Sequence, residues 1–331
     1  MIIMNEQQIM DMYGMDDAIP DVEATLRSLA DGKIDNPLRT VIGFPERSAS
    51  VLYMPCADLQ DGIAASKTVS IFPENPKANG LPTTQGVVLV TDATDGRHLA
   101  TLNASYLTRL RTGAMSGLAT DRLARQEASV LCVIGTGGMA YEQVLGVLAV
   151  RDIREILLVN PTRSKAEAFG ERLRREGRIS GDVRVRVVED VNEAVNRADI
   201  INCATRSETP VFDGEAVRPG THVNGVGSYL PHMREVDETF IRCCSKIIAD
   251  DLHGVQEEAG ELIHADRSGA WSFDDLHGEL VHLATGEVPG RENDEEITFF
   301  KCVGAAYYDL AVAKGVYRKA EAGGHGVQVE V

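Results

Sequence analysis

The sequence predicts an α/β protein in which a Rossmann-type, doubly wound parallel sheet is joined to a second, mostly antiparallel α+β domain. A chain of 331 residues is long enough for two domains, since a domain typically has roughly 100 to 200 residues. Between residues 130 and 250, short apolar runs alternate with helical patterns, which is typical of parallel strands with crossover helices. The preceding region shows strands in direct succession. We therefore expect one domain over residues 1–115, completed by 305–331, and the other over residues 116–304.

The first domain is expected to begin with a helix over residues 16–30 and to continue with strands. These strands are predicted at 38–44, 50–54, 62–71, 86–91 and 98–102. Asp95 and Gly96 favour a hairpin turn between the last two. Helical patterns at 103–122 and 295–314 predict one helix that leads into the second domain and one that packs back on the first. The glycine-containing tail 321–331 is expected to be loose.

The second domain is predicted to contain six strands, each a short apolar run. They lie at 130–134, 156–160, 183–188, 199–204, 221–226 and 246–250. Between the first two, apolar side chains from Met139 to Val150 predict a helix that packs on a sheet. Cys132 and Cys203 lie within the apolar runs, so we interpret them as core residues rather than nucleophiles.

The composition excludes several classes of protein. Asp and Glu number 50 against 33 Lys and Arg, a formal charge of -17, and such a surface repels the phosphate backbone of a nucleic acid. No apolar stretch reaches the roughly 18 residues that span a bilayer, and the start lacks a basic segment followed by an apolar one. We therefore expect a cytoplasmic protein without nucleic-acid or membrane partners. The cysteines form no CxxC pair and the histidines no HExxH, so no metal site is expected.

A glycine-rich turn follows the first predicted strand of the second domain. Its residues are Gly135, Thr136, Gly137, Gly138, Met139 and Ala140. In such a turn the first glycine permits the sharp bend, the second lets a pyrophosphate approach the backbone, and the small last residue lets helix and strand pack closely. The helix that begins here offers free N–H groups to phosphates. Because the motif lies in a series of six strands, we favour a dinucleotide site over a turn without a ligand.

The end of the next strand indicates which dinucleotide binds. An acidic side chain there would bind the ribose hydroxyls of NAD, but this strand ends at Asn160. Neutral Asn160 does not repel a 2′-phosphate, and Thr162, Arg163 and Lys165 can hydrogen-bond or neutralise one. We therefore expect NADP(H) to be favoured over NAD(H). The alternative is that Arg163 and Lys165 are solvated helix residues and that NAD binds beside Asn160.

Three cations lie in or beside apolar segments, where a charge is costly unless a ligand or partner compensates it. Arg39 precedes a predicted strand, Lys67 lies within one, and Arg111 lies in the helix at 103–122. Each is a candidate anchor for an anionic substrate. For each of these residues taken alone, a surface position or a structural ion pair is as well supported as substrate binding. The periodicity of apolar residues does not decide between these alternatives.

Several motifs occur in an order that resembles the ornithine cyclodeaminase and mu-crystallin family. Besides the Lys67 strand and the glycine turn, they are Asn-Pro-Leu-Arg at 36–39, Arg-Leu-Arg-Thr-Gly-Ala at 109–114, Cys-Ala-Thr at 203–205, Asn-Gly-Val-Gly-Ser at 224–228 and Phe-Lys-Cys-Val-Gly at 300–304. The resemblance covers nearly the whole chain. Members of this family are typically dimers built through the non-nucleotide domain. The resemblance therefore implies a homodimer, a substrate and dimerisation domain at 1–115 with 305–331, and an NAD(P)-binding domain at 116–304.

The resemblance also implies where a substrate carboxylate would bind. Arg39, Lys67 and Arg111 would hold it, with Thr84 nearby, and Lys67 and Arg111 would act in catalysis. An arginine binds a carboxylate through two parallel hydrogen bonds, which fixes its orientation as well as its charge. Lys67 could act through its charge alone, or could also polarise the substrate or relay a proton.

For the cofactor, the resemblance places Thr205 and the loop 224–227, which contains Val226, on the nicotinamide side. Val303 and Gly304 would close the pocket. Independently of the resemblance, Thr205 and Gly225 fall at the carboxyl ends of two predicted parallel strands. An open parallel sheet binds its ligands at that edge.

One departure from the family pattern separates its activities. Ornithine cyclodeaminases carry Gly-Gly-Asp-x-Pro, whose Asp is the acid–base group for the substrate amine, whereas this chain has Gly-Ser-Tyr-Leu-Pro at 227–231. Tyr229 therefore stands where the carboxylate would be, and a phenol is a poor base at neutral pH. We expect NAD(P)H-dependent reduction of a small cyclic imino acid, pyrroline-2-carboxylate or piperideine-2-carboxylate, to proline or pipecolate. A cyclic imine that enters already protonated at nitrogen needs only an anchor for its carboxylate and a hydride.

Three other functions compete with this one. The first is cyclodeamination of ornithine to proline and ammonia, with NAD used catalytically. The second is an oxidoreductase like the alanine dehydrogenases of the family. The third is a non-enzymatic binder like mu-crystallin, since a fold alone does not establish an activity.

Overall fold

The computed structural model describes residues 1–330, which form two compact units. Unit 1 comprises Met1–Arg111 and Ala305–Val331, and unit 2 comprises Thr112–Gly304. Helix α4 (Ala104–Leu123) carries the chain from the first unit into the second. Val331, the last residue of the tail expected to be loose, lies outside the described residues.

Unit 1 is built on one mixed sheet with the strand order β16-β1-β7-β6-β5-β4-β2, and β3 also pairs with β4. The bounds are β1 Ile2–Met4, β2 Ile34–Asp35, β3 Thr40–Phe44, β4 Ala49–Asp58, β5 Ile63–Ile71, β6 Thr84–Asp92, β7 His98–Asn103 and β16 Val327–Gln328. All pairs are antiparallel except β1 with β7. Along β5, buried and half-buried residues alternate, as expected for a strand with one face on a core.

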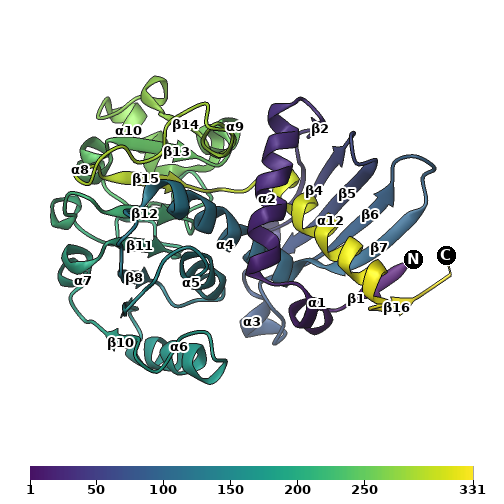
Figure 1. The fold of residues 1–331 in the computed structure, drawn as a ribbon, viewed down its shortest axis with the longest axis horizontal. Helices are drawn as coiled ribbons and strands as arrows, with labels where there is room; N and C mark the ends of the chain where they lie inside the picture. Colours follow the sequence, from purple (N-terminus) through teal and green to yellow (C-terminus); the bar gives the residue numbers. More distant parts are fainter. Residues whose placement is uncertain (331) are drawn as a thin grey trace. The chain divides into compact units, whose positions relative to one another are not determined.

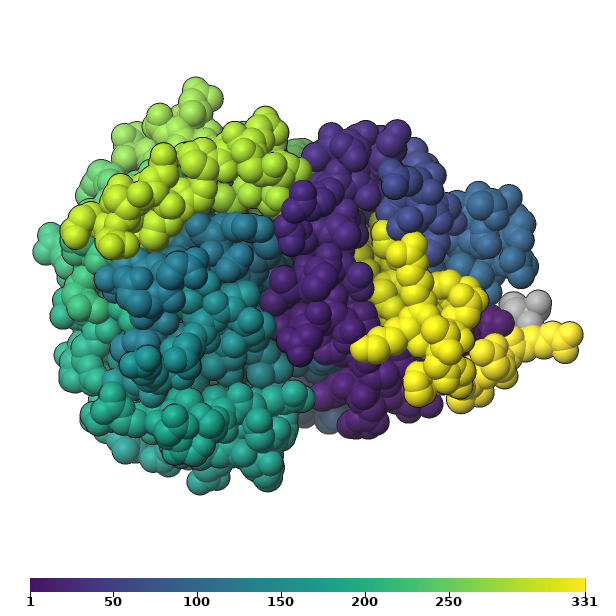
Figure 2. All heavy atoms as spheres, viewed as in Figure 1, coloured from purple at the N-terminus to yellow at the C-terminus, as the bar shows by residue number. Residues whose placement is uncertain are grey.

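Two long helices cover one face of this sheet, α2 (Met15–Ala30) and α12 (Ala306–Gly323) (Figure 1). They pack against each other and lie side by side on the surface (Figure 2). Three shorter helices, α1 (Glu6–Met12), α3 (Asn75–Ala78) and η1 (Pro45–Arg47), complete the unit. Helix α1 begins at Asn5, whose side chain accepts from the backbone of Gln8 while the Gln8 side chain accepts from Asn5, the capping box that stabilises a helix start.

Unit 2 is an eight-stranded parallel sheet with the order β10-β9-β8-β11-β12-β15-β13-β14. Its strands are β8 Val130–Ile134, β9 Glu155–Val159, β10 Arg184–Val187, β11 Ile200–Cys203, β12 His222–Gly225, β13 Lys246–Ala249, β14 Gly278–Glu279 and β15 Thr298–Lys301. From β8, the chain builds outward first through β9 and β10 and then, on the other side, through β11 and β12. The strand order therefore reverses between β8 and β11, the point at which such sheets bind ligands.

Helices cover both faces of the unit 2 sheet. They are α5 Ala140–Leu148, α6 Arg163–Arg175, α7 Val191–Arg197, α8 Glu238–Cys243, α9 Leu252–Glu258, α10 Gly260–Ser268 and α11 Leu280–Thr285, with short turns η2 Gly214–Ala216 and η3 Phe273–Asp275. Leu131 and Val133 of β8 join the core under α5 and α6, whereas Cys132 and Ile134 join the core under α7 to α10. A strand buried on both faces needs a continuous apolar run, which explains its sequence. The doubly wound parallel sheet and the mostly antiparallel second sheet confirm the predicted fold class. Cys132 and Cys203 are fully buried core residues, as expected.

Two predictions about the C-terminal region were wrong. The helix predicted at 295–314 begins only at Ala306, because Thr298–Lys301 forms β15 between β12 and β13. Phe299 and Phe300 are both fully buried, and a strand buried on both faces lacks the alternation that distinguishes it from a helix. The tail is also more ordered than expected, since Val327 and Gln328 pair with Ile3 and Ile2 of β1. No helix within residues 1–330 is both long and apolar enough to cross a membrane.

Candidate active site

A buried ion cluster occupies the helix-covered face of the unit 1 sheet. Lys67 lies at the middle of β5, and its side chain is only 4% exposed. Its Nζ donates to Oδ2 of Asp309 at 2.5 Å, and Nε of Arg111 lies 3.5 Å from Oδ1 of the same carboxylate. Asp309 comes from α12 and Arg111 from α4. The structure therefore brings two of the three predicted anchors together around an acidic residue that sequence reasoning missed.

Burial lowers the pKa of Lys67, since the charged ammonium loses its water. The neighbouring charges of Arg111 and Arg39 lower it further, whereas Asp309 opposes the shift. Arg39 itself is half-buried just before β3, and its charge is among those that lower the pKa of Lys67. We define the cation cluster as Arg39, Lys67, Arg111 and Asp309.

Thr84 lies farther along the sheet. It begins β6 opposite Ile71, whereas the partner of Lys67 on that strand is Val88. Four residues of strand separate Thr84 from Val88, about 13 Å at roughly 3.4 Å per residue. Thr84 is on the same face as Val88 but is exposed, so within unit 1 it is not part of the cation cluster.

The glycine turn of unit 2 follows β8, as the sequence indicated. Gly135 has a φ of 87°, and a Cβ on it would meet the carbonyl oxygen of Ala204 and Cγ2 of Thr205 at 2.9 Å, so no other residue fits. Gly137 and Gly138 are exposed, and a Cβ on either would meet nothing within 4 Å. Ala140 is fully buried where α5 packs on the sheet. The tight first glycine, the open space over the next two and the start of α5 together fit a bound pyrophosphate.

Asn160 contacts this turn, and Arg163 begins the helix that follows β9. Oδ1 of Asn160 accepts from the backbone N–H of Thr136 at 3.2 Å, and its Nδ2 donates to the carbonyl of Thr162. Arg163, at the start of α6, pairs with Glu167 at 2.9 Å and with Glu189 at 2.8 Å. Its side chain is 59% exposed. Arg163 is therefore accessible to a ligand, but a phosphate would compete with two carboxylates for it.

The remaining predicted cofactor residues lie at the carboxyl ends of three neighbouring strands. Thr205 follows β11, Val226 follows β12 and donates its backbone N–H to the carbonyl of Cys203, and Val303 follows β15. Two buried carboxylates hold these loops. Glu235 accepts from the backbone of Thr205 at 2.6 Å, and Asp250 accepts from that of Val303 at 3.1 Å. Neither acid was anticipated from the sequence.

Comparison with known proteins agrees with these features. The family model described as the ornithine cyclodeaminase/mu-crystallin family matches residues 1–324. The chain belongs to this family. It is 38% identical to the Delta(1)-pyrroline-2-carboxylate reductase of Bacillus cereus over 333 residues, which covers 100% of both chains.

Two solved structures of the family are similar over almost their full length. One is Thermococcus litoralis Delta(1)-pyrroline-2-carboxylate reductase in complex with NADH and L-proline, at 35% identity and a TM-score of 0.94, covering 99% of this chain and 100% of the other. The second is an archaeal alanine dehydrogenase dimer with bound NAD, at 33% identity and a TM-score of 0.91, covering 99% and 98%. The family resemblance inferred from the motifs is thereby confirmed.

The segment that departs from the cyclodeaminase members of the family lies directly after β12. Ser228 is fully buried, and its hydroxyl donates to Glu261 at 2.6 Å. Tyr229 is half-buried, and Leu230 is 37% exposed. The position that holds an Asp in cyclodeaminases therefore carries a partly accessible phenol beside a well-anchored serine.

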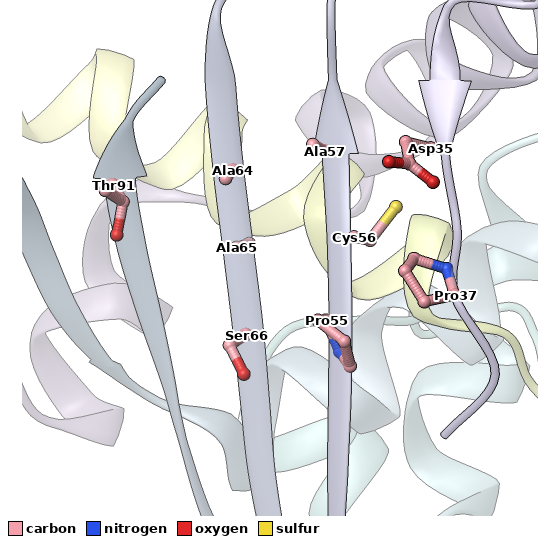
Figure 3. A pocket seen from close by; sticks show the side chains of 9 residues that line it. All are labelled: Asp35, Pro37, Pro55, Cys56, Ala57, Ala64, Ala65, Ser66 and Thr91. Atoms are coloured by element: carbon pink, nitrogen blue, oxygen red, sulfur yellow. The ribbon is translucent and has the colours of Figure 1, made fainter. Parts of the chain in front are cut away.

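A cavity of about 290 Å³ opens in unit 1. Strands β4, β5 and β6 line it through residues such as Pro55, Ser66 and Thr91, and Asp35 lies at its edge (Figure 3). None of Arg39, Lys67, Thr84 and Arg111 is among its lining residues. We therefore do not assign the substrate to it.

Proposed function

We propose that this chain reduces a small cyclic imino acid, pyrroline-2-carboxylate or piperideine-2-carboxylate, to proline or pipecolate with NAD(P)H. The cation cluster is the observation that carries this proposal, because it offers buried positive charge to one small carboxylate. The likeness to Delta(1)-pyrroline-2-carboxylate reductases over the full chain supports it, as does the L-proline bound in the Thermococcus structure.

The charges of the cation cluster suit a monoanionic substrate. The cluster contains three cations and one carboxylate, so these residues carry an excess of two positive charges. Arg39 and Arg111 can each orient the substrate carboxylate through two hydrogen bonds, while Lys67 adds a compact charge. Asp309 fixes Lys67 and Arg111 in place. NAD(P)H supplies the hydride that the imine carbon accepts, and an imine that is already protonated at nitrogen becomes the amine without a further proton.

The fit of the glycine turn, together with Thr205, Val226 and Val303, supports unit 2 as the holder of the cofactor. We propose that NADP(H) is favoured over NAD(H), because β9 ends without an acid and the exposed Arg163 is available to a 2′-phosphate. Two features oppose the preference: the ion pairs of Arg163 with Glu167 and Glu189, and the NADH or NAD bound in the similar structures. A tenfold weaker affinity for NADPH than for NADH would refute it.

We further propose a homodimer formed through the face of the unit 1 sheet opposite Lys67. Ile42, Phe44, Tyr53 and Val87 are each at least 40% exposed, and their strand positions place them on the face opposite Lys67. An exposed apolar patch of this kind is typical of an interaction surface, and the similar alanine dehydrogenase is a dimer. Light scattering at micromolar concentration should give a mass of twice 35.9 kDa.

The deciding experiment is a screen of NADPH and NADH oxidation with five- and six-membered cyclic imino acids. We expect turnover with at least one of them. Ornithine and pyruvate with ammonia serve as comparison substrates. Ammonia release from ornithine without net NADH formation would favour a cyclodeaminase, and alanine-dependent NADH production would favour an alanine dehydrogenase. Cofactor binding with no turnover of any imine would favour a binding protein.

A further inference from the structure

Glu235 lies where two loops of the nicotinamide side meet. Its side chain is fully buried, and its two oxygens divide between the loops. Oε1 accepts from the backbone N–H of Thr205 at 2.6 Å and from its hydroxyl at 2.8 Å, after β11. Oε2 accepts from the backbone N–H of Gly227 at 2.7 Å and of Ser228 at 3.3 Å, after β12. One carboxylate thus joins the ends of two adjacent parallel strands through four donors.

The two loops approach each other closely at Gly227. A Cβ on Gly227 would lie 2.0 Å from the carbonyl oxygen of Thr205 and 2.5 Å from Oε1 of Glu235. Gly227 is therefore required for this approach, because any side chain would clash with both the Thr205 backbone and Glu235. The position of each loop depends on the same side chain.

A buried ion network anchors Ser228, one of the residues whose backbone donates to Glu235. Ser228 Oγ donates to Glu261, and Nζ of Lys301 lies 3.0 Å from Oε1 of Glu261 and donates to the Ser228 carbonyl at 2.7 Å. Lys301 and Glu261 are at most 1% exposed. A buried carboxylate is retained only where donors and opposite charges compensate its lost hydration. An ordinary helix cap differs from this arrangement, because Asp190 accepts from two backbone N–H groups of its own helix, α7, and does not join two loops.

We propose that Glu235 is a positioning residue for the cofactor. It fixes the Thr205 and Gly227 loops before the cofactor binds, so that binding does not have to order them. The assignment of these loops to the nicotinamide rests on the proposed function. Glu235 does not touch the reacting atoms, and its effect passes through the two loops.

The test compares Glu235→Gln and Glu235→Asp with the unchanged chain. The glutamine amide must aim its NH₂ at the N–H groups of one loop, which loses its acceptor, whereas aspartate keeps the charge but is too short to reach both loops. We expect the NADH Kd of Glu235→Gln, measured by titration calorimetry, to rise roughly 10- to 100-fold. The kcat should fall, the KM for the imino acid should change less than about twofold, and Glu235→Asp should recover part of the loss.

The control is Glu155→Gln in the same unit. Glu155 is also a buried acid, 5% exposed, and it pairs with Arg186 and Arg197. It lies at the amino end of β9, away from the loops. Thermal unfolding of every variant separates a loss of stability from a loss of affinity. An NADH Kd of Glu235→Gln no weaker than that of Glu155→Gln would overturn the proposal.

Two further outcomes remain decisive. If Glu235→Gln does not fold, Thr205→Val removes one donor to Glu235 and leaves the backbone contacts, and a wild-type Kd for both Thr205→Val and Glu235→Asp would overturn the proposal. If Glu235→Gln loses NADH affinity but the unchanged chain reduces no imino acid, the positioning role stands and the proposed reaction fails.

Discussion

In unit 1 the carboxylate of Asp309 lies between two buried cations, whereas in unit 2 the carboxylate of Glu235 lies among four N–H and O–H donors of two loops. The first cluster carries excess positive charge, and the second pairs its acids with Lys301 and with neutral donors. The unbalanced positive charge makes the unit 1 cluster a candidate ligand site, whereas the unit 2 carboxylate is satisfied by backbone and hydroxyl donors. Burial identifies a group under constraint, and a buried cluster whose charges do not balance is a candidate for ligand binding.

The largest effect is expected for Arg111→Ala, which removes a charge from the cluster. The substrate loses both affinity and orientation, so KM should rise and kcat should fall together, with kcat/KM reduced by about 100-fold or more. Steady-state kinetics with the best imino acid measures this. The matched control is Arg109→Ala on the same helix, because Arg109 pairs with Glu6 at 2.5 Å instead of Asp309. Unchanged turnover of Arg111→Ala would remove this residue from the site.

Asp309→Asn tests whether the single acid of the cluster sustains the charge of Lys67. Burial lowers the pKa of Lys67, and Asp309 opposes that shift. Without the carboxylate the pKa falls further, so the alkaline limb of the kcat/KM profile should move to lower pH. At neutral pH, kcat/KM should fall roughly tenfold, since Lys67 and Arg111 lose a charged hydrogen-bond partner.

The pH profile decides between two explanations of that loss. A uniform decrease with an unmoved alkaline limb would mean that Asp309 only holds the helix in place. The variant Lys314→Met provides the comparison, because Lys314 makes a second buried ion pair between α12 and the sheet, with Asp58 at 2.6 Å. Lys314→Met should lower the stability of the protein without shifting the alkaline limb of its kcat/KM profile.

The interior of unit 2 offers a third test, on a polar network without net charge. His222 is fully buried between Thr298 and Asn224, at 2.9 Å and 3.1 Å. Burial lowers the pKa of His222 to about 3, below its value of about 6.5 in an unfolded chain. The unfolded state therefore binds the proton first, and this group leaves stability unchanged above about pH 6.5 and reduces it as the pH falls toward 3.

The expected loss from His222 is about 2 kcal/mol between pH 7 and pH 5. Urea unfolding at the two pH values measures it. His222→Gln should lower stability at pH 7 but abolish this part of the pH dependence, whereas Gln at the exposed His325 should leave it intact. An equal acid loss in His222→Gln and in the unchanged chain would show that His222 is not the group responsible.

The elements that sequence reasoning located correctly are those encoded locally. Strand β8 is one apolar run, and the glycine turn follows it within six residues. The error at β15 arose because Phe299 and Phe300 are both buried and run directly toward α12. The apolar pattern continues from the strand into the helix and does not mark the boundary between them. In the structure the chain turns at Gly304, which has a φ of 94°.

The residues that sequence reasoning missed depend on distant partners. Asp309 is 242 positions from Lys67, and Glu235 is 30 positions from Thr205. A lone acid between Tyr308 and Leu310 was the available signal for Asp309, because an apolar helix buries such a residue only with a partner. Glu235 lies in a loop, where no apolar periodicity distinguishes buried from exposed residues. The two loops that it contacts come together only in the folded sheet.

The smallest effect concerns the surface of unit 2, where solvent weakens ion pairs. Arg163 is shared between Glu167 and Glu189, and exposed pairs contribute roughly 0 to 1 kcal/mol. Glu189→Gln should free Arg163 and remove a charge that repels a 2′-phosphate, so the KM for NADPH should fall about two- to fivefold while that for NADH stays constant. Glu193→Gln, which alters the pair with Arg197 on α7, is the control. Equal changes for both cofactors would mean that Arg163 does not contact the 2′-phosphate, and the cofactor preference would then have to arise at Asn160.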